Sequence, residues 1–193
     1  MKKLFLILTV LVLTSFSYAG EYKVDPVHSS VGFQIRHFVS KVNGEFREYQ
    51  STFNFDEKNL KSSNVSFTVE TKSIDTRNEK RDEHLRSADF FDVEKFSTAS
   101  FHSKKITSSG KNKYKLAGDF TLHGVTKPVT FDVEYGGSIK DFEGHTRVGF
   151  SASAKINRKD YGISWNKILD KGGLALGEDV LITLQIEAPE VKK

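Results

Sequence analysis

The sequence predicts an all-β domain, an up-and-down antiparallel barrel interrupted once by a short helical insert. Apolar and polar residues alternate along about eight short runs, which is typical of strands with one buried face. Turn signals rich in glycine, asparagine and serine separate the runs, and no long helical pattern lies between them. Closing the strands into a barrel removes exposed sheet edges, so we favour a barrel over the alternative, a β-sandwich.

The N-terminus has the pattern of a secretory signal peptide, which we assign to residues 1–19. Two lysines precede an apolar run over residues 4–16, and a small-residue cleavage site ends at Ala19. The alternative is a retained membrane anchor, but the run is shorter than the ~20 residues that a spanning helix needs. We therefore expect residues 20–193 to form one mature domain outside the cytoplasm, in the periplasm.

Three strand regions are predicted in the first part of the mature domain. Alternation over residues 31–35 predicts a half-buried strand. Asn43 and Gly44 form the dipeptide most typical of a two-residue hairpin turn, so we expect the chain to reverse there. The next runs cover residues 46–55 and 65–69.

A densely charged segment, residues 77–92, interrupts this pattern and ends in a Phe-Phe pair. It is the only part of the predicted mature domain that resembles neither a strand nor a turn, so we expect a short helix that closes the mouth of the barrel. Phe90 and Phe91 would face the interior. The charged side chains would stay near the rim, namely Arg81, Asp82 and His84.

Alternating runs resume after the insert and continue to the C-terminus. Turns are expected at residues 108–110, at His123 and Gly124, and where one strand ends at Gly136 and Gly137. The strands between them are predicted at residues 101–103, 114–122, 129–135, 148–156 and 180–186. A longer loop over residues 158–179 contains the single tryptophan, Trp165.

Phenylalanine dominates the predicted inward face. The rings on the apolar phase of their strands are those of Phe33, Phe46, Phe53, Phe55, Phe67, Phe101, Phe120, Phe131 and Phe150. They either fill an ordinary core or line a cavity, because an eight-stranded barrel has room for packed side chains or for one small ligand. Strands of ~10 residues give a barrel roughly 30 Å long, which suits a long, thin, apolar molecule. Small inward residues, Gly118, Ala152 and Ala154, would leave a gap in a packed core.

The absence of several sequence motifs excludes a number of common function classes. There is no nucleophile elbow, no phosphate-binding glycine loop and no dinucleotide fingerprint. The chain has no cysteine and no metal-ligand spacing among its six histidines, so we predict neither a metal site nor a cofactor. Removal of the two lysines in the signal peptide lowers the formal charge from +4 to +2, too little to indicate nucleic-acid binding.

Motifs along the whole mature chain resemble the YceI family of exported lipid- or polyisoprenoid-binding proteins. Each fragment is weak alone, but their order carries the resemblance. The fragments include Tyr22-x-Val24-Asp25-Pro26-x-His28-Ser29, Ser73-Ile74-x-Thr76-x-Asn78-x-x-Arg81-Asp82-x-His84-Leu85, Ser87-x-Asp89-Phe90-Phe91-Asp92, Gly118-Asp119-x-Thr121-x-x-Gly124-Val125-Thr126-Lys127-Pro128-Val129 and Ile156-Asn157-Arg158-x-Asp160-Tyr161-Gly162.

The resemblance implies a lipocalin-like extended eight-stranded antiparallel β-barrel that carries a long apolar chain, such as a polyisoprenoid, an isoprenoid quinone or a fatty amide. It also implies a non-enzymatic carrier and is compatible with a homodimer. We expect the inward phenylalanines, Phe90, Phe91 and Trp165 to line the ligand site. Arg81 and His84 are the head-group candidates, because a guanidinium fork suits phosphate or carbonyl oxygens. For Arg81 the competing interpretation is a structural role beside Asp82.

Two other functions stay open at this point. The first is an enzyme acting on such a lipid through the rim residues Arg81, Asp82 and His84. The second is a secreted stress protein whose barrel is packed and holds no ligand. Neither alternative assigns a membrane span to the mature chain.

Overall fold

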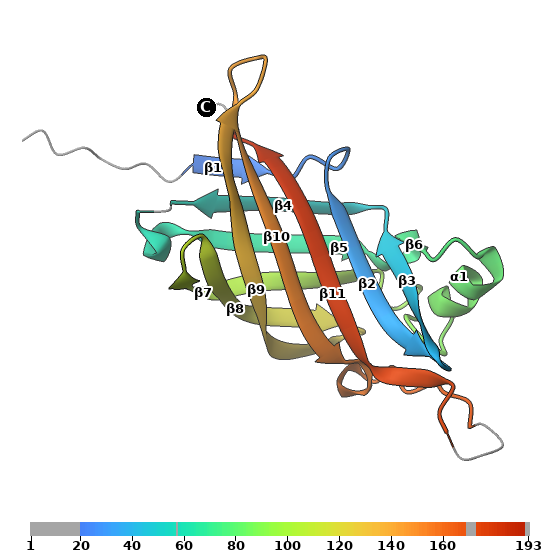
Figure 1. Ribbon diagram of the computed structural model, residues 1–193. Helices are drawn as coiled ribbons and strands as arrows, with labels where there is room; N and C mark the ends of the chain where they lie inside the picture. Colours follow the sequence, from blue (N-terminus) through green and yellow to red (C-terminus); the bar gives the residue numbers. More distant parts are fainter. Residues whose placement is uncertain (1–19, 57, 169–172, 192–193) are drawn as a thin grey trace, which may run out of the picture.

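The protein is one curled antiparallel β-sheet, seen in a computed structural model that describes residues 20–56, 58–168 and 173–191 (Figure 1). Its strands are β1 Gly20–Lys23, β2 Ser30–His37, β3 Ser40–Phe46, β4 Tyr49–Phe55, β5 Asn64–Glu70, β6 Ile74–Asp75, β7 Thr98–Gly110, β8 Lys113–Leu122, β9 Val125–Lys140, β10 Thr146–Asn157 and β11 Leu176–Pro189. The predicted signal peptide and its cleavage site lie outside the described residues. No helix in the described part of the chain is long and apolar enough to cross a membrane.

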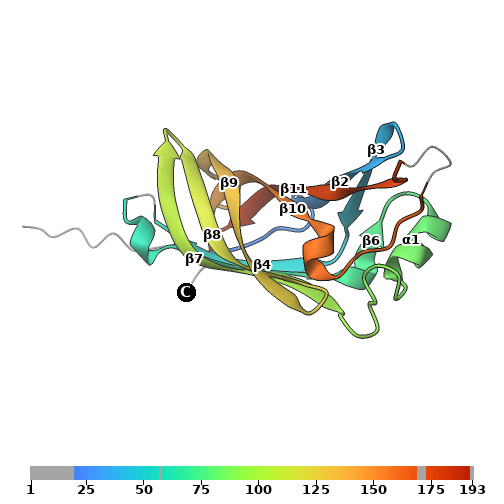
Figure 2. The same ribbon diagram turned by 90° about the horizontal axis from the view of Figure 1, so that it is seen from below.

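The hydrogen-bonded order confirms the predicted up-and-down antiparallel topology for most of the sheet. The order is β1-β4-β5-β7-β8-β9-β10-β11-β2-β3-β6, eleven strands within the described residues, of which β1 and β6 are short. The sheet curls back on itself at the β1 end of this order. β1 pairs with β4 and also meets the end of β11 through a bridge between Tyr22 and Glu190. The sheet therefore encloses an interior (Figure 2).

The predicted hairpin at Asn43 and Gly44 is wrong. Both residues lie inside β3, and the chain reverses at Phe38 and Val39, because His37 pairs with Ser40. Gly44 is required for packing and not for a turn. A Cβ there would lie 2.4 Å from the ring of Phe33, which crosses over it. The turn dipeptide was therefore a misleading local signal, overridden by a side-chain contact between two strands.

Two further boundaries differ from the predicted ones, whereas one turn is confirmed. β7 continues through residues 108–110, and the turn comes at residues 111–112. β9 continues past Gly136 and Gly137 to Lys140, with a register shift opposite the glycines. The turn at His123 and Gly124 is as predicted, and both residues have the positive φ that a tight hairpin requires.

The charged insert forms the one α-helix of the described residues, α1 Glu79–Arg86. Asn78 caps it, and its side chain accepts a hydrogen bond of 3.0 Å from the backbone N–H of Arg81. Short 3-10 turns at Leu60–Ser62, Thr71–Ser73 and Arg158–Tyr161 complete the helical content. Both ribbon views place α1 at one end of the sheet (Figures 1 and 2).

The interior divides into two main core regions. The region beside α1 contains buried side chains from the insert, from several strands and from the loop before β11, among them Phe90, Leu122, Ile156 and Ile163. The other region contains Tyr22, Phe53, Tyr135 and Val148, and lies where β1 meets the sheet. A small cluster of Phe101, Phe131 and Ala154 lies in the middle strands.

Candidate functional site: an apolar cavity beside the helical insert

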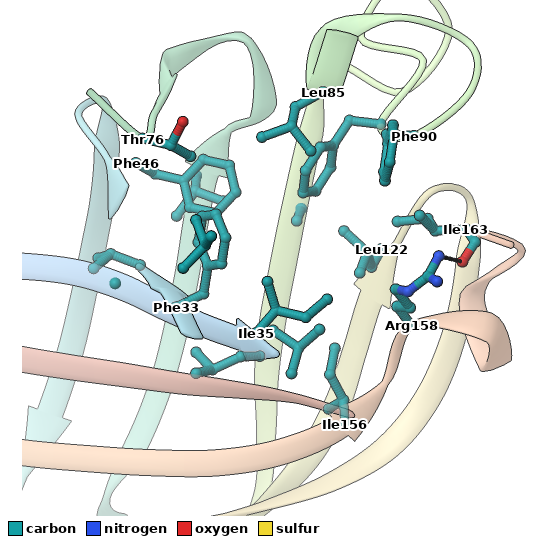
Figure 3. Close-up of a pocket in the computed structure, with 18 of the residues that line it drawn as sticks. Phe33, Ile35, Phe46, Thr76, Leu85, Phe90, Leu122, Ile156, Arg158 and Ile163 are labelled. Carbon is teal, nitrogen blue, oxygen red and sulfur yellow. Dashed lines mark hydrogen bonds between the residues drawn. The ribbon is translucent and has the colours of Figure 1, made fainter. Parts of the chain in front are cut away.

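An apolar cavity of about 390 Å³ lies inside the curled sheet, and we call it the main cavity. Its wall comes from β2, β3, β5 and β7–β11, from α1 and the residues after it, and from the loop before β11. Most of the lining side chains are apolar (Figure 3). The few polar groups include Thr76, Arg81, His84 and Arg158.

Most of the predicted lining residues surround the main cavity. Those that line it are Phe33, Phe46, Phe67, Phe90, Phe91, Phe101, Phe120, Phe131 and Trp165. Figure 3 shows Phe33, Phe46 and Phe90 around one space. Whether these side chains bind a ligand stays a prediction.

Phe53, Phe55 and Phe150 have a different environment. They line a separate apolar cavity of about 100 Å³, which shares Phe67, Ala152 and Leu184 with the wall of the main cavity. Ring centroids of Phe55 and Phe150 are 5.1 Å apart, within the range of favourable aromatic pairs. The interior is thus divided into two compartments, and the aromatic rings fill much of the far one.

The gap expected at Gly118 is also filled. A Cβ at Gly118 would lie 2.6 Å from the ring of Phe101 and 2.3 Å from the carbonyl oxygen of His102. The missing side chain lets the Phe101 ring lie against the strand. Ala152, by contrast, lines both cavities, as its small size suggested.

Arg81 and Asp82 are both bonded to Thr76. Arg81 Nε donates to Thr76 Oγ1 at 2.7 Å, and Arg81 Nη2 donates to the Thr76 carbonyl at 2.7 Å. The buried Asp82 carboxylate accepts from the Thr76 N–H at 3.0 Å and from its hydroxyl. These contacts join the helix to the chain before it, which favours the structural interpretation of Arg81. Its role as a head-group ligand stays a prediction.

His84 connects the insert to the tryptophan loop. Its Nε2 lies 2.8 Å from an oxygen of Asp89. The imidazole ring also packs edge-on against Phe90 and Trp165, with centroid distances of 5.0 and 4.9 Å. Phe90 and Trp165 are themselves 5.2 Å apart. The insert and the loop therefore close one side of the cavity together.

Arg158 is one of several polar lining residues that were not predicted from the sequence. Its side chain is 3% exposed, and it donates from Nε to the Gly177 carbonyl at 2.9 Å and from Nη1 to the Ile163 carbonyl at 2.8 Å (Figure 3). Its Nη2 has no hydrogen-bond partner among the described residues. The alternation along β10 could have predicted that Arg158 faces the interior, because residue 158 continues the inward phase of Ala154 and Ile156.

The profile of the YceI-like domain matches residues 22–188. The chain belongs to the YceI family. The protein YceI of Salmonella arizonae is 40% identical over 163 residues, which cover 83% of this chain and 85% of that protein. The crystal structure of a Campylobacter jejuni YceI protein is 30% identical, with a TM-score of 0.70 over 82% of this chain and 91% of that one.

A more distant structure shares the fold of this YceI-family chain. It is described as a polyisoprenoid binding domain from Saccharophagus degradans, and it is 12% identical with a TM-score of 0.62. The match covers 90% of this chain and all of that one. At this identity the likeness shows the fold alone.

One charged cluster of this YceI-family protein lies away from the main cavity. Asp25, His28 and Glu187 bring possible metal-ligand atoms within 4.8 Å of one another. Arg147 Nη1, however, donates to Asp25 and to Glu187, at 2.9 Å each, and Arg147 Nε donates to Asp141 at 2.9 Å. A guanidinium therefore already balances these carboxylates, so the cluster has the character of an ion-pair network.

Proposed function

We propose that this YceI-family protein is a periplasmic, non-enzymatic carrier that holds the tail of an amphiphilic lipid in the main cavity. The single observation that carries this proposal is the lining of that cavity, which is formed mostly by aromatic and aliphatic side chains. A ligand with a long apolar chain would remove this surface from contact with water, which is favourable. The Saccharophagus degradans neighbour, described as polyisoprenoid binding, supports the same class of ligand.

The size of the cavity also supports a ligand and argues against a fully packed barrel. Protein interiors have few voids larger than a water molecule, whereas small-molecule sites typically have volumes of ~300–1,000 Å³. At about 390 Å³ the main cavity lies in the second range. The smaller cavity beyond Phe67 and Leu184 offers room for the end of a longer chain.

The contacts of the rim residues favour carriage over catalysis. Asp82 accepts hydrogen bonds from Thr76, Arg81 donates to the same residue, and His84 contacts Asp89. Each of the three candidate catalytic groups is thus engaged in holding the insert. An acid–base site would instead direct such groups toward a common reacting atom.

Export to the periplasm is part of the proposal. It rests on the signal-peptide pattern of residues 1–19. N-terminal sequencing of protein from the periplasmic fraction tests it, with a start at Gly20 as the expected result. A protein that still begins at Met1 would contradict cleavage after Ala19.

The test of carriage is native mass spectrometry of the protein isolated from its own periplasm without detergent. We expect one lipid-sized mass per subunit, and the same mass after prolonged incubation and organic extraction. Conversion of the extracted lipid during incubation would indicate an enzyme. Protein that carries no added mass, and takes up none when offered an amphiphile, would contradict the proposal. The spectrum also gives the number of subunits, which tests the homodimer.

A further inference from the structure

The guanidinium of Arg158 is a buried cation in the wall of an apolar cavity. Two of its three nitrogens each donate one hydrogen bond, Nε to the Gly177 carbonyl and Nη1 to the Ile163 carbonyl. Nη2 is buried and lacks a partner in the part of the chain that the structure describes. A buried polar group without a hydrogen bond is unfavourable, and a charged one more so. Among the described residues only His123 Nε2 shares this state with Arg158 Nη2, and His123 does not line the main cavity.

The charge of Arg158 has no direct counter-ion among the described residues. Burial lowers the pKa of its guanidinium, and Glu178 raises it. The Glu178 carboxylate is bonded to other side chains, to Lys159 at 2.5 Å and to Asn157 at 3.4 Å. Arginine nevertheless stays protonated in proteins. The cation is therefore retained in an apolar wall, and no described carboxylate forms an ion pair with it.

The position of Nη2 is fixed by its own loop. The chain turns back at Gly162, which has a φ of 78°, and the Ile163 N–H donates to the Arg158 carbonyl at 3.3 Å. The Ile163 carbonyl in turn accepts from Arg158 Nη1, so residues 158 and 163 are joined twice. Because the guanidinium is planar, two bonded nitrogens fix the direction of the third. Both Arg158 and Ile163 line the main cavity.

We propose that Arg158 Nη2 anchors the polar end of the bound lipid by donating to one oxygen acceptor, a carbonyl or a carboxylate joined to a long apolar chain. This rests on the proposed carrier function and assigns the head group to a residue inside the cavity, in place of Arg81 on the rim. Nη2 is the one nitrogen of this guanidinium without a partner, and a single carbonyl or carboxylate oxygen would provide one. A diphosphate head would need several donors, and the other guanidinium of the wall, that of Arg81, already donates to Thr76 twice.

The test measures how strongly the protein prefers a ligand with a head oxygen. The delipidated full-length mature protein is titrated with a long-chain fatty amide, the fatty acid, the alkyl diphosphate and the hydrocarbon of equal length. Trp165, the only tryptophan and a lining residue, reports binding by its fluorescence. We expect the amide and the acid to bind about 10- to 100-fold more tightly than the hydrocarbon, the range for a hydrogen bond to a charged group.

Two variants distinguish a hydrogen bond from Arg158 to the head group from a general effect of Arg158 on packing. Arg158→Met keeps an apolar side chain of similar length, and we expect it to abolish the preference while hydrocarbon affinity changes less than about threefold. The matched control is Arg86→Met, because Arg86 also donates to two carbonyls, those of Lys72 and Ile74, but does not line the cavity. It should keep the preference. Retention of the preference in Arg158→Met, or a diphosphate that binds best, would overturn the anchor.

The outcomes distinguish the anchor from the carrier function. If wild-type protein binds none of the four ligands, the carrier function fails. If it binds the amide, the acid and the hydrocarbon equally, only the anchor fails, and a trapped water is then the partner of Nη2. Should Arg158→Met not fold, arginine side-chain NMR of the wild type decides. The Arg158 signals should shift with the amide and stay unchanged with the hydrocarbon, and equal responses to both would overturn the anchor.

Discussion

The imidazole of His84 stands edge-on to the indole of Trp165, with ring centroids 4.9 Å apart. This contact joins the helical insert to the loop before β11, two segments that are far apart in the sequence and that both line the main cavity. A ligand that enters between the insert and this loop must separate the two rings, so we hypothesise that the contact acts as a gate.

The first prediction concerns this contact. His84→Ala removes the ring that packs on both Phe90 and Trp165, so we expect faster ligand release with a smaller change in the thermal midpoint. Stopped-flow fluorescence of Trp165 measures the release rate. His102→Ala serves as a control, since His102 lies on β7 and does not line the cavity. Equal release rates in His84→Ala and wild type would argue against a gate at this position.

The second prediction concerns a charge introduced into the main cavity by substitution. Phe131→Asp places a carboxylate beside Phe101, in a wall where Phe131 is 6% exposed. The change costs several kcal/mol or raises the pKa of the new carboxyl, and it should abolish lipid binding. Equilibrium titration and urea unfolding measure the two effects. Phe142→Asp, at a fully exposed ring, should alter neither, and undiminished binding by Phe131→Asp would contradict the cavity assignment.

Arg81 gives the third prediction. Removing its side chain in Arg81→Ala takes two donors from Thr76, which is 5% exposed, so we expect ligand-free protein to lose about 1–3 kcal/mol of unfolding free energy. Any loss of affinity should then follow from the loss of stability. If affinity falls while the ligand-free unfolding free energy stays the same, Arg81 binds the head group and the structural interpretation is wrong.

The fourth prediction concerns acid stability at the far end of the barrel. Hydrogen bonds from His28 and Arg147 lower the pKa of Asp25 to about 2, and Arg147 lowers that of Asp141 to about 2. Both values lie below the ~3.9 of an unfolded aspartate. The ionised carboxylates therefore stabilise the fold above about pH 4, and this contribution is lost as the pH falls toward 2.

The variant Arg147→Met isolates that contribution. We expect it to be less stable than wild type near pH 6, with a difference that shrinks as the pH approaches 2, where both carboxylates become protonated. Urea midpoints at several pH values measure this. A difference between the two proteins that stays constant from pH 6 to pH 2 would show that these aspartates do not carry the effect.

Alternation in the sequence predicted the strands and many of the inward rings, because a two-residue period depends only on which face is buried. It could not predict how the rings share the interior. Phe101 and Phe150 have the same inward phase, yet Phe101 lies over Gly118 beside the main cavity and Phe150 packs on Phe55 in the smaller one. That difference depends on strand register and curl, which no local pattern contains.

Local signals were misleading where tertiary contacts decide. Asn43 and Gly44 had the composition of a hairpin turn. Position 44 instead requires a glycine because the ring of Phe33 lies over it and leaves no room for a side chain. Arg158 had the inward phase of β10, but a charged residue at the end of a strand is ordinarily expected to be exposed. Its significance depends on two carbonyls outside the predicted alternation, that of Ile163 in the loop before β11 and that of Gly177 at the start of β11.

The lipid site is tested most directly by a crystal structure of the protein loaded with a long-chain fatty amide. We expect the apolar tail to lie in the main cavity against Phe101 and Phe131, and the carbonyl oxygen to lie within hydrogen-bond distance of Arg158 Nη2. An amide bound outside the barrel, or a main cavity closed by rearranged side chains, would contradict this expectation.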